Sequence, residues 1–349
     1  MFRLNPLTLE NLKRFRSLRR GYWSFIIMML LIFLSLVAEL FVNSRALVVR
    51  YDSKLYFPVY GAIIPGARFG LGYDYETDYR QLKKQLSGNS RGDFVIMPPI
   101  PYNPYETDFI DGSYPPFPPS IERRHFLGTD RTGRDIAARL IYGFRISIIF
   151  SLILLVFNYA IGISVGSLMG YLGGRFDLFF QRIIEIWNNI PYLYAIIIIS
   201  SIIIPNFFSL LGIMIFFGWI GITWYMRTAV YSEREREYVL AAKAMGASTF
   251  RIIAKHIIPN TLSVIITFIP FAVAGGITAL TALDYLGFGL APPVPSWGQL
   301  LAEASQYNIA APWIGISVIT ALVIVLSMVT FIGESVREAY DPKKFTTYE

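Results

Sequence analysis

Apolar residues gather in six long runs along this chain. A helix needs about 20 apolar residues to cross roughly 30 Å of hydrocarbon. Runs close to that length cover residues 22–42, 146–170, 183–204, 207–226, 261–280 and 313–332. The pattern predicts an all-α integral membrane protein with six transmembrane helices.

The run at 183–204 is the least regular of the six. Polar residues and a proline interrupt its first half at 185–191, and only 192–204 is continuously apolar. We still expect one span there. Because only residues 205–206 separate it from the next run, the two helices should form an antiparallel hairpin.

Composition supports a membrane protein and removes several other classes. Mean hydropathy is +0.48, 54% of the residues are hydrophobic and 16% are charged, whereas soluble domains average about a quarter charged residues. The chain has no cysteine and two histidines. Disulfides, thiolate metal sites and a cysteine nucleophile are therefore excluded, and we expect no metal site and no catalytic residue.

The distribution of positive charge predicts an orientation. With a cytoplasmic N-terminus, the inner segments are 1–21, 171–182, 227–260 and 333–349, which carry six, two, six and three Lys or Arg residues. The short outer connections 205–206 and 281–312 carry none. This asymmetry is typical of a chain with both ends in the cytoplasm. It also accounts for most of the net charge of +7, so no nucleic-acid partner is indicated.

The basic segment 1–21 followed by the apolar run 22–42 could also be read as a cleavable signal peptide. The run of 21 residues is longer than the usual apolar core of a signal, and no clean small-x-small cleavage site follows it. We expect it to be retained as the first transmembrane helix.

The segment 43–145 is the one long stretch that would fold outside the membrane. Eight prolines fall between Pro98 and Pro119, interleaved with aromatic residues, which favours extended backbone over helix. We expect a loop-rich periplasmic segment. It could wrap the helices rigidly, which is the simpler reading, or it could dock a periplasmic partner.

Candidate chemistry inside the spans is sparse. Residues 162–166 read Gly-Ile-Ser-Val-Gly, which matches a nucleophile elbow but lies in the middle of an apolar run. Gly162, Gly166 and Gly170 recur every four residues, so we expect them to form a close helix contact. No Asp, Glu, Lys, Arg or His lies in the centre of any run, and no Gly-Lys phosphate loop exists. No residue of the substrate pathway can be named.

The most structured polar segment is 227–260. Acidic residues followed by an alanine-rich stretch predict a short helix that Gly246 would end, and Ser248 could cap a second helix. The small residues Ala241, Ala242 and Gly246 would leave a surface that a partner can approach closely. A solvated connector lying on the membrane is the other interpretation.

Residues 237–260, EYVLAAKAMGASTFRIIAKHIIPN, closely resemble the EAA loop of ABC importer permeases of the oligopeptide and dipeptide type. In that family the loop forms a coupling helix seated on a separate ATPase subunit. The residues that match the motif are Glu237, Ala241, Ala242, Gly246 and Pro259. Leu240 departs from it, because the motif has a glutamate there.

Other blocks are similar to the same family over most of the chain. They include Leu-Gly-Thr-Asp at 127–130 with Gly-Arg-Asp at 133–135, Leu-Gly-Phe-Gly at 286–289, Pro-Ser-Trp-Gly at 295–298 and Asp-Pro at 341–342. The blocks at 19–24, 49–52 and 56–58, with the enlarged first outer loop, look most like the Yej-type permeases associated with microcin C and peptide uptake.

The resemblance implies a permease subunit of a bacterial inner-membrane peptide importer. Its transmembrane core would cover 146–332 and its cytoplasmic tail 333–349. Expected partners are a second homologous permease, ATPase subunits, a periplasmic substrate-binding protein, the peptide substrate and membrane lipid. No cofactor is expected on this chain, since the ATPase would use ATP and Mg. The alternative is a stand-alone proton-coupled peptide carrier.

Overall fold

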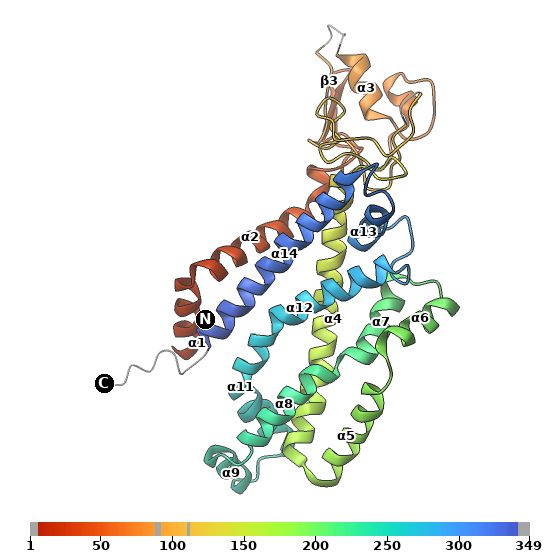
Figure 1. The fold of residues 1–349 in the computed structure, drawn as a ribbon. Helices are drawn as coiled ribbons and strands as arrows, with labels where there is room; N and C mark the ends of the chain where they lie inside the picture. Colours follow the sequence, from red (N-terminus) through yellow and green to blue (C-terminus); the bar gives the residue numbers. More distant parts are fainter. Residues whose placement is uncertain (1–5, 88–91, 110–111, 341–349) are drawn as a thin grey trace.

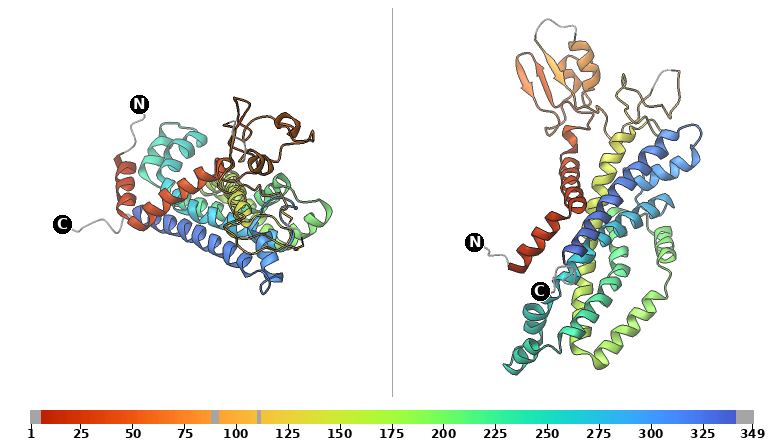
Figure 2. Two further views of the ribbon diagram at one scale, coloured as in Figure 1. Left: turned by 90° about the horizontal axis from the view of Figure 1, so that it is seen from above. Right: turned by 60° about the vertical axis from the view of Figure 1, so that its left-hand side comes forward.

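The computed structural model describes residues 6–87, 92–109 and 112–340, and it shows a tilted helical bundle with a separate domain at one end (Figure 1). This head domain comprises the described residues of the stretch 37–135. A group of short helices lies at the opposite end of the bundle (Figures 1 and 2). The predicted all-α membrane fold is thus confirmed, with a non-helical addition.

Five helices among the described residues are long and apolar enough to cross a bilayer, and a bent pair of helices makes a sixth if the pair counts as one span. The bundle contains α1 (Pro6–Ser17), α2 (Arg19–Leu36), α4 (Ile136–Leu172), α5 (Gly174–Asn188), α6 (Tyr192–Ile202), α7 (Phe207–Gly218), α8 (Ile220–Glu233), α12 (Leu262–Tyr285) and α14 (Pro312–Ala339). Helices α7 and α8 follow one another as one span. The tail beyond residue 340, with its Asp-Pro block, lies outside the described residues.

The span expected over 183–204 is a pair of helices with a bend between them and not one straight helix. Helix α5 starts earlier, at Gly174, and α6 follows it at an angle of 69°. Pro191 lies in extended backbone just before α6, where its missing N–H and fixed φ disfavour a continuing helix. With 11 residues, α6 is about 16 Å long and too short to cross a bilayer alone.

Helix α4 forms the centre of the bundle and is longer than predicted. Its 37 residues extend about 55 Å, because it begins at Ile136 and not at residue 146. The glycine contact is confirmed. A Cβ built on Gly166 would lie 2.5 Å from the Thr223 carbonyl oxygen of α8, and one on Gly170 would lie 2.6 Å from the Arg227 carbonyl oxygen. These glycines bring the two backbones together.

The head domain is not only loop. A three-stranded antiparallel sheet of order β2-β1-β3 contains β1 (Val48–Tyr51), β2 (Lys54–Tyr56) and β3 (Phe94–Ile96), and it is joined by α3 (Tyr79–Leu86) and the short helices η1 (Ala38–Leu40) and η2 (Gly66–Phe69). Val49, Phe69 and Leu82 are buried together in a small core of its own. The proline-rich stretch 98–119 is free of helix and strand in its described part, as expected.

Buried charges join the head domain to the start of α4. The Asp130 carboxylate is fully buried and lies 2.7 Å from Arg134 Nε and 3.2 Å from Arg139 Nη1. Arg139 is also fully buried and donates through Nη2 to Gln299 on α13 (Trp297–Gln306), at 3.2 Å. Glu303 of α13 lies 3.6 Å from Arg134. Removing one member of this network would leave an opposite charge without compensation.

A second buried cluster lies beside the first. The imidazole of His125 is 1% exposed and lies between two carboxylates, with Nδ1 2.8 Å from Asp135 and Nε2 3.1 Å from Asp108. Tyr102 stacks on the ring with a centroid distance of 4.0 Å. Asp135 also caps α4, because its side chain accepts from Ala138 N at 2.7 Å. His125 therefore links the proline-rich segment to the first turn of the central helix.

Candidate functional site

The segment with the EAA-like motif forms a compact group of short helices between α8 and α12, at the end opposite the head domain (Figure 1). It contains α9 (Glu237–Ala244), α10 (Thr249–Ile252), the π-helical turn η3 (Ile253–Ile257) and α11 (Ile258–Asn260). We refer to residues 234–260 as the coupling loop. Pro259 lies in α11 at the start of the last turn before α12, and so does not belong to α9.

The turn after α9 has the geometry that the sequence predicts. Gly246 adopts φ +79°, a left-handed conformation that glycine tolerates best. Ala247 N donates to the Ala242 carbonyl at 3.1 Å and Gly246 N donates to the Lys243 carbonyl at 3.0 Å, which is the pairing of a Schellman motif. The Ser248 side chain then caps α10 by accepting from Arg251 N. Both predicted roles, the helix stop and the cap, are confirmed.

The inner face of α9 packs on the membrane helices. Val239 and Ala242 are 1% and 2% exposed, in one apolar cluster with Met226 of α8 and with Ile252 and Ile257 of the coupling loop. The expectation that Ala242 lies on the free surface is therefore wrong. One of the paired alanines fixes α9 against its own chain, because a helix of this pitch turns adjacent residues about 100° apart.

The outer face of α9 and the following turn is exposed and largely apolar. Met245 is 81% exposed, Phe250 82% and Leu240 49%, and the predicted site residues Glu237, Ala241 and Gly246 are exposed as well. We call this set of six residues the α9 face. Large apolar side chains in such a group are typical of a protein contact surface. The sequence analysis did not name Met245 and Phe250. A large apolar residue in a segment with charged neighbours is the sequence signal that could have indicated a contact surface.

Polar contacts tie the coupling loop to the bundle. Tyr238 donates to Glu233 at the end of α8 at 2.5 Å, and Arg234 Nη1 donates to the Gly170 carbonyl of α4 at 3.2 Å. Burial, with the hydrogen bond to Glu233, raises the pKa of Tyr238 to about 12, so the phenol stays protonated and donates. A displacement of α9 would thus act on α8 and α4 together.

A bidentate ion pair supports the same end of the bundle. Arg227 of α8 donates through Nε and Nη2 to the Asp177 carboxylate of α5, both at 2.6 Å. This geometry fixes direction as well as distance. Within residues 6–87, 92–109 and 112–340, no group of three or more His, Cys, Asp or Glu is arranged to hold a metal ion.

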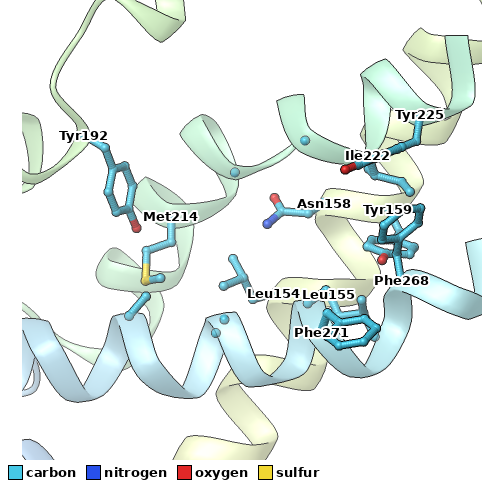
Figure 3. A pocket seen from close by; sticks show the side chains of 16 residues that line it. Leu154, Leu155, Asn158, Tyr159, Tyr192, Met214, Ile222, Tyr225, Phe268 and Phe271 are labelled. Carbon is cyan, nitrogen blue, oxygen red and sulfur yellow. The ribbon is translucent and has the colours of Figure 1, made fainter. Parts of the chain in front are cut away.

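The bundle also contains a recess for which the sequence named no residue (Figure 3). Its volume is about 330 Å³, and its walls come from α4, α6, α7, α8 and α12. The side chain of Asn158, on α4, extends toward the junction of α7 with α8, with Tyr192 and Met214 toward one end of the recess and Tyr225 toward the other (Figure 3). The sequence does carry a signal for this recess, because Asn158 is the one amide side chain in the run 146–170.

Comparison with known proteins agrees with this architecture. A family described as "Binding-protein-dependent transport system inner membrane component" matches residues 162–345. The inner membrane ABC transporter permease protein YejE of Escherichia coli (strain K12) is 41% identical over 347 residues, which cover 99% of each chain.

Two further relatives have narrower names. The peptidoglycan transport system permease protein YejE of Agrobacterium fabrum (strain C58 / ATCC 33970) is 38% identical over 365 residues, covering 97% of this chain and 94% of the relative. The dipeptide transport system permease protein DppC of Bacillus subtilis (strain 168) is 35% identical over 228 residues, covering 65% and 70%. The resemblance to dipeptide and Yej-type permeases is confirmed, and the chain belongs to the family of binding-protein-dependent transport system inner membrane components.

Proposed function

We propose that this chain is a permease subunit of an ATP-driven ABC importer that carries peptides across the bacterial inner membrane. The observation that carries the proposal is the α9 face, an apolar surface at the end of the bundle that receives no cover from the described residues. A separate ATPase subunit would cover it. The head domain would then lie in the periplasm and both chain ends in the cytoplasm, as the Lys and Arg distribution predicts.

In this proposal the permease transmits motion and catalyses no reaction. Closure of the ATPase dimer on ATP and Mg would push α9, and Tyr238 and Arg234 would pass the push to α8 and α4. Because the glycine contact joins α4 to α8, the pair would tilt as one rigid body. A second, homologous permease would complete the path, and a periplasmic binding protein would deliver the substrate.

The peptide substrate is proposed from the relatives. One is named a dipeptide transport permease and another a peptidoglycan transport permease, which share peptide bonds as a chemical feature. The recess in the bundle has room for part of a peptide chain.

A charge on the α9 face tests the proposal. Ala241 is exposed, so Ala241→Glu leaves the fold intact but buries an unpaired carboxylate if an ATPase seats there. We expect ATPase co-purification and ATP-driven peptide uptake to fall about tenfold or more. Gly246 is a poorer choice, because its φ of +79° strains any substitution.

The matched control is Ala310→Glu, an exposed alanine just before α14, near the head domain. Its ATPase association should equal that of the unsubstituted chain. Unchanged co-purification of the Ala241→Glu protein would contradict the proposal. Peptide accumulation driven by a pH gradient in vesicles that hold this chain alone would favour the proton-coupled carrier.

A further inference from the structure

The recess around Asn158 lies near the middle of three helices at once. Asn158 is about 33 Å along α4 from Ile136 and about 21 Å from Leu172. Gly221 lies near the centre of the span Phe207–Glu233, and Gly275 near the centre of α12. The recess therefore opens at mid-membrane depth.

Asn158 is unpaired at this depth. Its Oδ1 atom is buried and has no hydrogen-bond partner within the described part of the chain. An amide oxygen left unpaired in an apolar medium is costly, so a position of this kind calls for a group that donates to it. In Figure 3 the amide lies beside the point where α7 passes to α8.

The glycines of the recess leave space that helix packing does not need. A Cβ built on Gly221 or Gly275 would meet no described atom within 4 Å. A Cβ on Gly162 or Gly166 would instead meet α8 at 2.4–2.5 Å. The first pair of glycines thus keeps the recess open, whereas the second pair serves a helix contact.

A second recess of similar size provides a contrast. It has a volume of about 340 Å³ and is lined by apolar side chains of α2, α4 and α14, including Leu31, Ile141 and Ala321, with Ser35 as a polar member. Such a wall suits a lipid chain. The recess around Asn158 instead has three tyrosines on its wall, Tyr159, Tyr192 and Tyr225. Tyrosine hydroxyls and an amide suit a ligand with hydrogen-bonding groups of its own.

We propose that this recess receives the main chain of the peptide during translocation, with Asn158 pairing with one peptide group. An amide side chain offers both an acceptor and donors, as a peptide unit does, and it carries no charge. Among the described residues that line the recess, only the tyrosines are ionisable. The recess would therefore not select a peptide by the charge of its side chains. This inference rests on the proposed import of peptides.

The natural absence of cysteine allows a direct test. Single-cysteine variants Gly221→Cys and Gly275→Cys are compared with Ala321→Cys from the second recess, in the assembled importer in membrane vesicles. With a water-soluble methanethiosulfonate reagent, we expect the first two to react about tenfold faster than Ala321→Cys. A saturating tripeptide should slow their labelling about fivefold. Labelling as slow as that of Ala321→Cys, or labelling that peptide does not slow, would overturn the assignment.

Asn158→Leu tests the hydrogen bond itself. We expect peptide uptake to fall about tenfold, and an N-methylated peptide, which lacks the N–H, to lose less in this variant than in the unsubstituted chain. Ser164→Leu is the matched control on α4, because Ser164 is exposed and donates to its own helix at Ala160. Equal losses with N-methylated peptide in both proteins would overturn the pairing.

The two proposals can fail separately. ATP dependence of uptake is measured on the unsubstituted importer. ATP-driven uptake with no peptide protection at Gly221→Cys would remove only the pathway assignment, whereas ATP-independent uptake would remove the importer proposal.

Discussion

Helix α4 belongs to two regions that are held together by different interactions. At its first turns, fully buried Arg139 and the Asp135 cap join the head domain through charges. At its other end, Gly162 to Gly170 meet α8 through close backbone contact, with no ion pair in the contact that the structure describes. One helix thus connects an ionic joint to a packed joint.

The difference follows from the surroundings of each region. In lipid the hydrophobic effect does not drive helices together, so small residues that allow close approach supply the attraction. Beside water, a head domain with a small core can add buried ion pairs and hydrogen bonds. Substitution of one partner in such a pair is strongly destabilising, because it leaves the other partner as a buried charge without compensation. The two joints should therefore respond differently to substitution.

The largest effect is expected for Asp130→Asn in the ionic joint. The asparagine keeps the shape but removes the charge that faces Arg134 at 2.7 Å and fully buried Arg139 at 3.2 Å. We expect a loss of about 3–5 kcal/mol in stability, measured by thermal unfolding of the full chain in detergent.

The control for this substitution is Arg131→Gln. Arg131 is half exposed and its Nε lies 4.0 Å from Glu303, so its loss should cost less than about 1 kcal/mol. Similar effects for Asp130→Asn and Arg131→Gln would mean that the joint is not held by its buried charges.

A smaller effect is expected for Gly166→Ala in the packed joint. The added methyl would lie 2.5 Å from the Thr223 carbonyl oxygen, so α4 and α8 must separate. We expect a loss of about 2 kcal/mol in the same unfolding measurement. Gly212→Ala on α7 is the control, because a Cβ there meets no described atom within 4 Å. It should stabilise by about 0.5–1 kcal/mol through helix propensity. Equal shifts of the same sign would argue against a packed joint.

The bundle could be predicted from the sequence because lipid imposes one strong rule. Each of the six long apolar runs contains a helix, and the glycine spacing predicted the α4–α8 contact. The sequence did not predict the bend at Pro191 within the run 183–204, nor that the segment 136–145, which carries Arg139 and Arg145, continues α4 beyond the apolar run. Hydropathy does not register a bend within a span or a helix that continues past its apolar run.

The head domain was harder to predict. Its strands contain three or four residues, too few for an alternating pattern to be recognised. The hairpin between β1 and β2 turns on Asp52 and Ser53, with φ +48° and +60°, and lacks the glycine that normally signals such a turn. Its charged residues pair over short sequence distances, such as Asp130 with Arg134, but only the tertiary packing buries them.

The coupling loop could be predicted from the sequence only in part, less well than the bundle and better than the head domain. Gly246 and Ser248 act locally, so their roles could be read from the sequence. Burial of Ala242 depends on how α9 packs against α8, and the recess around Asn158 depends on five helices meeting. Local signals predicted the turn and the caps, and only tertiary packing decided which face is free.

The smallest effect is expected for the pH dependence of the head domain. Burial alone lowers the pKa of His125, but hydrogen bonds to Asp108 and Asp135 outweigh it, so the pKa lies above its usual value. A raised pKa stabilises the fold fully below about pH 6.5, and this contribution is lost as the pH rises through the folded-state pKa. Above about pH 6.5 we therefore expect the local stability of the head domain to fall as the pH rises.

Hydrogen exchange of the Phe117 amide in the full chain measures this loss, after correction for the intrinsic pH dependence of exchange. That amide donates at 2.8 Å to Thr129, within four residues of His125. In the His125→Gln protein, protection should be lower at pH 6 and nearly constant up to pH 8, because the chain's other histidine, His256, lies in the coupling loop at the opposite end. A pH dependence that survives His125→Gln would show that the imidazole is not the group whose titration changes the stability of the head domain.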